Sequence, residues 1–337
     1  MESLSVGLVG VTGHGTTILN AILAAGNLRL HSCYDANQAL AGEFADRTGA
    51  LLASAYEELL ADPGLHAVVL VTPNDIHYQD VLKAVAARKH ILVETPIATT
   101  VAEARAMVEM TRSAGLVFMA GHNARRRKVV RRARQVLSEG TIGKIVAAEA
   151  NTSRPTGMEP GLPAWRSDPK ISPLLPMTHL GVHMVDVIEY LLGPIRRVCC
   201  IAQNVAMPGM VFDSTAALLE LESGTPCTLS SSYVSPEVGF LRIYGTKGAI
   251  HCGSASLDLE LLRENGRSER TVEKFRDQGE QSYVEQMREF GECVLNGRVP
   301  ETDGEVGLRA VAVVEAMRAS LESSALVAVN DILGEMR

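Results

Sequence analysis

The first 120 residues alternate between short apolar runs and helix-forming runs, and this alternation constrains the fold more than any other feature of the sequence. The apolar, strand-like runs are residues 4–9, 28–34, a short run near 51, 67–72, 90–94 and 117–120. The helical runs between them are 16–25, 38–48, 55–61, 79–87 and 101–114. Strands that alternate with helices in this way predict a doubly wound parallel sheet. In such a sheet, ligands bind beyond the carboxyl ends of the strands.

A glycine-rich turn, Gly10-Val11-Thr12-Gly13-His14-Gly15, joins the first strand to the first helix. Such a turn lets backbone amides and a helix N-terminus approach a pyrophosphate, because both favour negative charge. The dinucleotide fingerprint has glycine at its first, third and sixth positions, whereas here the third is Thr12 and an extra glycine follows. We predict that the cofactor-binding residues of this turn are Gly10, Thr12, Gly13, His14 and Gly15.

Asp35 ends the second strand-like run, 20 residues after Gly15. A carboxylate at this place accepts hydrogen bonds from the adenosine ribose hydroxyls and repels a 2'-phosphate. The alternative is an aspartate that only opens the loop or caps the next helix. The agreement of strand, turn, helix and spacing favours the cofactor interpretation, with NAD in preference to NADP.

The later strands of the first half end in compact polar segments, which are TPNDIH at 72–77, Glu94-Thr95-Pro96 and Gly121-His122-Asn123. Turn chemistry alone accounts for their proline, asparagine and glycine residues. It does not account for a polar segment at each of these strand ends, where a ligand is expected.

Length and composition narrow the class of protein. A chain of 337 residues with 46% hydrophobic residues predicts two well-packed domains. A net charge of -7 argues against a nucleic-acid partner. The six cysteines form no CxxC pair or regular framework, which indicates reduced thiols. We find no secretory signal before the first strand and no apolar run long enough to span a bilayer, so we expect a soluble, cytoplasmic protein.

Residues 172–193 have an apolar stripe at helical spacing, with His179 and His183 one turn apart. Two imidazoles on one face are typical of a site that needs an acid, a base or a ligand, since histidine titrates near pH 7. The alternative is a pair of partly buried helix histidines that neighbouring groups satisfy.

The chain resembles the Gfo/Idh/MocA family of NAD(P)-dependent sugar and cyclitol oxidoreductases. The matching segments cover nearly the whole chain: the glycine turn, Asp35, TPNDIH, HILVETP at 90–96, GHNARR at 121–126, Trp165-Arg166, GVHMVD at 181–186, LRIYGTKGAI at 241–250 and GLRAVAVVEAMRAS at 307–320. The resemblance extends the predicted cofactor residues to Thr72, Pro73, Asn74, His77, Glu94 and Thr95.

The resemblance implies an α/β plus α+β architecture with a Rossmann domain at 1–122 and a second domain at 123–337. The second domain would contain a large, mostly antiparallel sheet whose open face holds substrate and often mediates a homodimer or homotetramer. The β-rich runs 144–151, 198–205, 214–222, 226–234 and 240–245 agree with this. Late helices at 282–295 and 304–323 are expected to cross back.

Two residues depart from the family's catalytic pattern. The family associates proton transfer with the lysine of a Glu-Lys-Pro motif and with an aspartate and a histidine four positions apart. Here Thr95 stands in the lysine position and His179 in the aspartate position, while His183 is kept. A threonine hydroxyl hydrogen-bonds but carries no charge. We therefore predict His183 as general acid/base, with His179 relaying a proton, binding substrate or repelling a proton on its neighbour.

Cationic or protonatable groups gather in the expected substrate site. The predicted substrate-binding residues are His122, Asn123, Arg125, Trp165, Arg166, His179 and His183, with Arg126 beside them. Guanidinium groups suit a carboxylate, which favours an acidic sugar, cyclitol or cyclic diol as substrate. The alternatives are a solvated basic helix face for most of the run 125–134 and a loop anchor for Trp165.

The leading functional prediction is an NAD-dependent oxidoreductase that acts on a secondary alcohol or ketone of a cyclic, sugar-like small molecule. A second is a hydrolase or lyase that retains NAD and uses transient oxidation. A third is a metal-dependent variant in which His179 and His183 bind a divalent ion, although the leading prediction includes no metal. A fourth is a dinucleotide-binding protein without catalysis.

Overall fold

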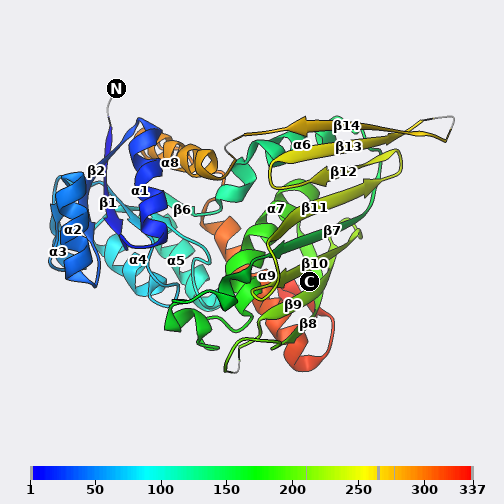
Figure 1. The fold of residues 1–337 in the computed structure, drawn as a ribbon. Helices are drawn as coiled ribbons and strands as arrows, with labels where there is room; N and C mark the ends of the chain where they lie inside the picture. Colours follow the sequence, from blue (N-terminus) through cyan, green and yellow to red (C-terminus); the bar gives the residue numbers. More distant parts are fainter. Residues whose placement is uncertain (1–2, 210, 264–265, 277, 335–337) are drawn as a thin grey trace. The chain divides into compact units, whose positions relative to one another are not determined.

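The computed structural model describes residues 3–209, 211–263, 266–276 and 278–334, which divide into two compact units (Figure 1). The first unit runs to Asn123 and resumes from Gly279 to Val311. The second runs from Ala124 to Gln278 and continues from Ala312. The expected domains were 1–122 and 123–337, whereas this division places residues 279–311 with the first unit. Residues 279–311 return to the first unit because Met287 and Phe290 complete its core.

The first unit contains a six-stranded parallel sheet. Its strands are β1 (Leu4–Val9), β2 (Leu28–Tyr34), β3 (Leu51–Leu52), β4 (Ala67–Leu70), β5 (His90–Val93) and β6 (Phe118–Ala120). The strand order is β3-β2-β1-β4-β5-β6, so the order reverses beside β1. This confirms the predicted doubly wound sheet, and ligands bind such sheets at the point of reversal.

The helices of the first unit are α1 (His14–Ala25), α2 (Gln38–Thr48), α3 (Tyr56–Ala61), α4 (His77–Ala86), α5 (Val101–Ser113) and α8 (Gln278–Asn296). Local capping explains several of their limits. The side chain of Thr100 accepts a hydrogen bond from the Glu103 amide at the start of α5. Buried side chains of α1, Ile18 and Ile22, pack with Phe290 of α8 in one apolar cluster. Figure 1 shows α1 and α8 next to each other in this unit.

The second unit contains a nine-stranded sheet. Its strands are β7 (Ile145–Ser153), β8 (Ile195–Gln203), β9 (Ser214–Leu221), β10 (Pro226–Ser232), β11 (Val238–Gly245), β12 (Gly248–Cys252), β13 (Ser256–Leu262), β14 (Ser268–Lys274) and β15 (Val327–Ala328). The order is β14-β13-β12-β11-β7-β10-β9-β8-β15, and only β7 and β10 pair in parallel. This confirms the predicted, mostly antiparallel sheet. Strands β12 to β14 extend it beyond the β-rich runs named above.

Helices cover one face of this sheet. The unit contains α6 (Lys128–Ser138), α7 (Val182–Leu192) and α10 (Val329–Leu333), while α9 (Gly304–Ser323) crosses from the first unit into the second. Helix α6 contacts β12 and β13, and α7 contacts β7. Side chains on the helix side, such as Leu219 and Ile243, are buried. Those on the other side, such as Ile201 and Leu218, are exposed, as alternation along a strand requires.

All six cysteines are free thiols, and five of them are buried. Among the described residues, no helix is both long enough and apolar enough to cross a membrane.

Candidate active site

The turn between β1 and α1 has no room for a side chain at two positions. Gly10 has φ +88°, and a Cβ there would lie 2.6 Å from the Val71 carbonyl oxygen. A Cβ on Gly15 would lie 2.3 Å from the Gly10 carbonyl oxygen. Thr12 and Gly13 are exposed, and no side chain caps the amides at the start of α1. The turn therefore offers backbone donors to an anion at close range, which fits the pyrophosphate of a dinucleotide.

Asp35 connects this turn to the loop after β2. Its Oδ2 accepts a hydrogen bond from the Val11 amide at 3.0 Å, and its Oδ1 accepts one from the Asn37 amide at 2.9 Å. Each carboxylate oxygen accepts more than one hydrogen bond, so capacity remains for a ribose hydroxyl. The carboxylate is thus held at the carboxyl end of β2, next to the glycine turn.

His77 joins the loops that follow β4 and β5. Its Nε2 lies 2.9 Å from the Thr72 carbonyl oxygen, and its Nδ1 lies 3.0 Å from the carbonyl oxygen of Pro96, which follows a cis peptide bond. Burial lowers the pKa of this imidazole, against the two carbonyl contacts. The ring is 1% exposed, as is expected of a group that ties two loops together. Asn74, in the loop after β4, is buried as well.

Glu94 is buried and lies next to the glycine turn. Its Oε1 is 3.7 Å from Nε2 of His14, and its carboxyl group packs over Gly121, where a Cβ would be 2.8 Å from Oε2. The ring of Tyr283, from α8, meets the His14 ring edge-on at 5.2 Å between centroids. The late helices were expected to cross back, but the sequence did not identify Tyr283, because no local pattern indicates which of their residues reaches this turn.

His122 and Asn123 are also buried within the first unit, at 1% and 2% exposure. The side-chain amide of Asn123 donates to the Ser282 hydroxyl at 2.8 Å. Ser282 in turn donates to the Gly279 carbonyl oxygen at 2.6 Å. Asn123, one of the predicted substrate residues, therefore helps to attach the returning helix α8.

The segment with the two histidines belongs to the second unit and is not one uniform helix. A π-helical turn (η4) spans Met177–Gly181, and α7 begins only at Val182, whose amide donates to the Met177 carbonyl five residues earlier. Single π-turns within helices occur frequently at functional sites. His179 lies in this turn, and His183 follows in the first turn of α7. The predicted continuous helix from residue 172 was wrong in this part.

His179 is enclosed by three side chains of its own unit. Its Nε2 lies 2.7 Å from the Ser172 hydroxyl, and its ring meets Trp165 edge-on at 5.5 Å between centroids. Burial lowers the pKa of His179 to about 3, and the charges of Arg166 and His183 act in the same direction. The imidazole is therefore neutral at physiological pH, and it does not repel a proton on His183.

Arg166 lies beside this imidazole with its guanidinium 5.2 Å from the centre of the Trp165 ring. The hydroxyl of Tyr233 is its hydrogen-bonding neighbour, and burial raises the pKa of that tyrosine to about 12 despite the arginine. Nε of Arg166 is buried without a hydrogen-bond partner in the described chain. We find no carboxylate paired with this guanidinium among the described residues.

Arg125 differs from Arg166, because its charge is already compensated. Its Nε donates to Oδ2 of Asp186 at 3.0 Å, and its Nη2 donates to the other carboxylate oxygen. The two side chains are 8% and 0% exposed. The guanidinium also stacks on Tyr190, 4.8 Å from the ring centre. Asp186 therefore occupies the two parallel donors that Arg125 was expected to offer to a substrate carboxylate.

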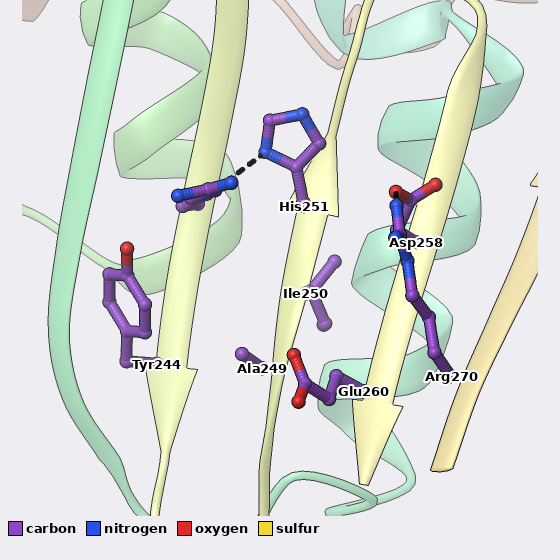
Figure 2. Close-up of a pocket in the computed structure, with 8 residues that line it drawn as sticks. Tyr244, Ala249, Ile250, His251, Asp258, Glu260 and Arg270 are labelled. Atoms are coloured by element: carbon purple, nitrogen blue, oxygen red, sulfur yellow. Dashed lines mark hydrogen bonds and ion pairs between the residues drawn. The ribbon is translucent and has the colours of Figure 1, made fainter. Parts of the chain in front are cut away.

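The outer face of the nine-stranded sheet carries a row of directly opposed residues across four strands. The row contains Glu149 of β7, Arg242 of β11, His251 of β12 and Asp258 of β13. Nε of Arg242 donates to Nδ1 of His251 at 3.0 Å, as Figure 2 shows. Around this row lies a hollow of about 250 Å³, lined also by Glu260 and by Arg270, which pairs with Asp258. Its charges are mostly matched by one another.

We find no group of three or more His, Cys, Asp or Glu side chains that would hold a metal ion in the described part of the chain. The predicted metal-dependent variant therefore gains no third ligand from the residues that surround His179 and His183.

Comparison with known proteins identifies the family. Residues 4–122 match the model of an oxidoreductase family with an NAD-binding Rossmann fold, and residues 130–251 match the GFO/IDH/MocA C-terminal domain. Myo-inositol 2-dehydrogenase of Thermotoga maritima is 24% identical over 98% of this chain and all of the relative. The 2,7-anhydro-N-acetylneuraminate hydratase of Escherichia coli is 30% identical over 73% of this chain and 67% of the relative.

A solved structure has the same fold along almost the whole chain. Levoglucosan dehydrogenase in complex with NADH and levoglucosan has a TM-score of 0.90 at 21% identity, over 97% of this chain and 100% of that one. Relatives of the chain include enzymes named for NAD and others named for NADP. The glycine turn, the held Asp35 carboxylate and both domain matches agree. The chain therefore belongs to the Gfo/Idh/MocA family and is an NAD(P)-dependent oxidoreductase.

Proposed function

We propose that this protein is an NAD-dependent oxidoreductase for a secondary alcohol of a cyclic, sugar-like substrate that carries a carboxylate. The observation that carries the proposal is the guanidinium of Arg166, which has no carboxylate partner among the described residues and lies beside His179, Trp165 and Tyr233. A guanidinium matches a carboxylate with two parallel donors. A substrate acid would supply the missing counter-charge.

Each unit contributes a part of the chemistry. The glycine turn and Asp35 of the first unit would hold the dinucleotide, whose nicotinamide supplies a hydride donor or acceptor when bound. The loop residues Thr72 and Pro73 would line the dinucleotide site, and the buried His77 would hold this loop through its contact with the Thr72 carbonyl oxygen. We assign NAD because the Asp35 carboxylate would repel a 2'-phosphate.

The second unit would bind substrate and move its hydroxyl proton. We assign the general acid/base role to His183, because the substituted Thr95 carries no charge and His179 stays neutral. Arg166 would hold the carboxylate, and the ring of Trp165 would form an apolar wall against the sugar. Thr95 would still hydrogen-bond to a substrate hydroxyl or to the cofactor amide.

The test compares matched pairs of substrates that differ only in charge. Purified protein with NAD is assayed for NADH formation on several aldoses and on the corresponding uronic acids. We expect the acid of at least one pair to have the higher kcat/KM. Arg166→Gln should then lower kcat/KM for the acid by about 10- to 100-fold, as expected for a lost charge-assisted hydrogen bond, and should change the neutral sugar little.

The matched control for this test is Arg263→Gln, which removes an exposed guanidinium that pairs with Glu269 on the same unit. It should leave both kcat/KM values unchanged. Equal loss on the acid and on the neutral sugar in Arg166→Gln would contradict the proposed carboxylate contact.

A second candidate function is a hydratase or lyase that retains NAD. The relative from Escherichia coli favours it, since it is named a hydratase and its substrate name denotes a carboxylate. Addition of water involves no net oxidation, so NADH does not accumulate. Turnover of a sugar acid with catalytic NAD and without NADH accumulation would support this candidate over the first.

We further propose that the outer face of the sheet binds a second copy of the chain. Ile201 and Leu218 are 72% and 50% exposed on adjacent strands of this face. The charged row lies on the same face of the sheet, and its acidic and basic side chains would complement those of a second, inverted row. Ile201→Glu should convert the dimer or tetramer to a monomer in light scattering. A monomeric wild-type protein would refute this assembly. The cytoplasmic location stays a prediction.

A further inference from the structure

The environment of Ser172 decides which nitrogen of His179 carries its proton. Ser172 is 0% exposed, and its amide donates to the Asp168 carbonyl oxygen at 2.8 Å, which holds the residue in place. Its hydroxyl has one hydrogen-bonding neighbour in the described chain, Nε2 of His179 at 2.7 Å. At this distance the two atoms form a hydrogen bond, in which one of them is the donor and the other is the acceptor.

Two arrangements are possible, and they differ in what they leave unsatisfied. If the ring donated from Nε2, the buried hydroxyl proton of Ser172 would have no acceptor. If the hydroxyl donates to Nε2, the oxygen and the ring nitrogen are both satisfied by one bond. A buried donor without an acceptor costs free energy, so the second arrangement is favoured.

We propose that Ser172 is a positioning residue that fixes His179 as the tautomer protonated on Nδ1, so that His179 offers substrate a neutral hydrogen-bond donor and not a base. The use of this donor rests on the function proposed above, whereas the tautomer itself does not.

The neighbours of the ring agree with this assignment. Nδ1 has no hydrogen-bond partner among the described residues, so its N–H is left for a ligand. The edge-on contact with Trp165 fixes the plane of the ring, and hence the direction of that N–H. The charged or titratable groups that act on the ring are Arg166 and His183, and both disfavour a second proton on it. Arg166 and His179 then present donors only, which suits an oxygen-rich anion.

This arrangement also explains how the site works without the aspartate of the family pattern. An aspartate in the position of His179 would place a negative charge beside the substrate carboxylate proposed above. A neutral imidazole with its N–H directed outward removes that repulsion and adds a hydrogen bond. Under this proposal, a neutral imidazole in this position would favour acidic substrates.

The test reads the tautomer directly, without substrate. Histidine is labelled with ¹⁵N, and long-range ¹H–¹⁵N correlation spectra of the full-length protein distinguish a protonated ring nitrogen from an unprotonated one. The His179 signals are assigned by their loss in His179→Gln. We expect a protonated Nδ1 and an unprotonated Nε2 near neutral pH. A proton on Nε2 in the wild-type protein would overturn the proposal, whatever the protein turns over.

Three variants complete the test. Ser172→Ala should move the proton toward Nε2, and Ser172→Thr should restore the wild-type tautomer because it keeps the hydroxyl. Thr178→Val is the matched control, since it removes a neighbouring buried hydroxyl that has no hydrogen-bond partner in the described chain. An unchanged tautomer in Ser172→Ala would contradict the role of the serine.

Kinetics test how the donor is used. On an acidic substrate that the enzyme accepts, kcat/KM of Ser172→Ala should fall by about three- to tenfold, as expected for one lost oriented hydrogen bond, and Ser172→Thr should recover it. A changed tautomer with unchanged kcat/KM would refute the donor role. Failure to turn over any acidic sugar would refute the proposed function, and the spectra would still decide the tautomer.

Discussion

The cofactor edge of the first unit and the histidine site of the second differ in how their polar groups are satisfied. At the cofactor edge, backbone groups hold the side chains: two amides donate to Asp35, and two carbonyls face the ring of His77. In the histidine site, Arg166 has no carboxylate and Nδ1 of His179 has no partner among the described residues. Asp35 and His77 are thus held by backbone groups of the fold, whereas the guanidinium of Arg166 and Nδ1 of His179 keep unused hydrogen-bonding capacity within the described chain.

Burial acts on titratable groups in both regions, with opposite results for acids and bases. It raises the pKa of Asp80, which lies under Thr72, to about 6. It lowers the pKa of His179 to about 3. Both groups are thereby driven toward their neutral forms. This leaves Arg166 as a charge that the histidine site does not compensate.

The largest effect is expected from His183→Ala. If this residue transfers the substrate proton, its loss should lower kcat by about 10²- to 10⁴-fold, because that is the usual contribution of a positioned acid or base. The dissociation constant of NAD should change little, since the cofactor residues belong to the other unit. Steady-state kinetics and titration calorimetry check the two expectations. His66→Ala, at an exposed histidine of the first unit, is the control. Retained activity in His183→Ala would end the assigned role.

A comparable effect, on stability rather than on rate, is expected from Arg125→Ala. The change would leave the carboxylate of Asp186 buried without its partner, which typically costs about 3–5 kcal/mol. Denaturant unfolding should therefore show a large loss in the free energy of unfolding. Arg134→Ala removes an exposed arginine that donates to the Tyr190 carbonyl oxygen, and it should cost about 1 kcal/mol or less. Similar losses in the two variants would show that the buried pair does not stabilise the unit.

The pH dependence of stability should be smaller and should distinguish the two regions. The pKa of His179 is lower in the folded protein, about 3 against the ordinary histidine value of 6.5, so the unfolded chain binds more protons below neutrality. The contribution of His179 to the free energy of unfolding should be fully present above pH 6.5. It should fall by about 2 kcal/mol between pH 6.5 and 4.5. Asp80 acts in the opposite sense, because its raised pKa stabilises the folded state as the pH falls through about 6.

Two variants separate these opposing contributions. As the pH falls, the free energy of unfolding should decrease less in His179→Gln than in the wild-type protein. It should decrease more in Asp80→Asn. Chemical unfolding at a series of pH values measures both. If His179→Gln has the same pH dependence as the wild-type protein, the imidazole is not kept neutral by its surroundings.

The sequence predicted the first unit well because its structure depends on local rules. The glycine turn needs backbone conformations that exclude other residues, and Asp35 follows a strand at a fixed spacing, so each is visible in a few consecutive residues. The late helices were expected to cross back, but residues 279–311 were still assigned to the second domain, because the apolar face with Phe290 looks the same whichever core it joins.

The histidine site was predicted less fully, because its properties depend on contacts between segments. The sequence indicated His179, Trp165 and Arg166, but it did not show that Ser172 faces the imidazole or that Asp186 neutralises Arg125. The sequence also did not predict the π-helical turn, since its residues have ordinary helical spacing. Arg125 and Arg166 were both predicted for the substrate site, but they differ in their partners. Arg125 pairs with Asp186, whereas Arg166 hydrogen-bonds Tyr233.

The smallest effect, about tenfold, is expected at the cofactor edge from Asp35→Ser. The wild-type protein should bind NAD more tightly than NADP, because the carboxylate accepts ribose hydroxyls and repels a 2'-phosphate. The variant removes a unit charge near solvent, which is worth about 1–2 kcal/mol, so the preference should narrow by about tenfold. Asp46→Asn, which removes an exposed charge from α2, should leave it unchanged. Fluorescence titration with both cofactors measures the ratio. Equal affinity of the wild-type protein for NAD and NADP would mean that the Asp35 carboxylate only accepts hydrogen bonds from the Val11 and Asn37 amides. Asp35 would then have a structural role and would not select between the two cofactors.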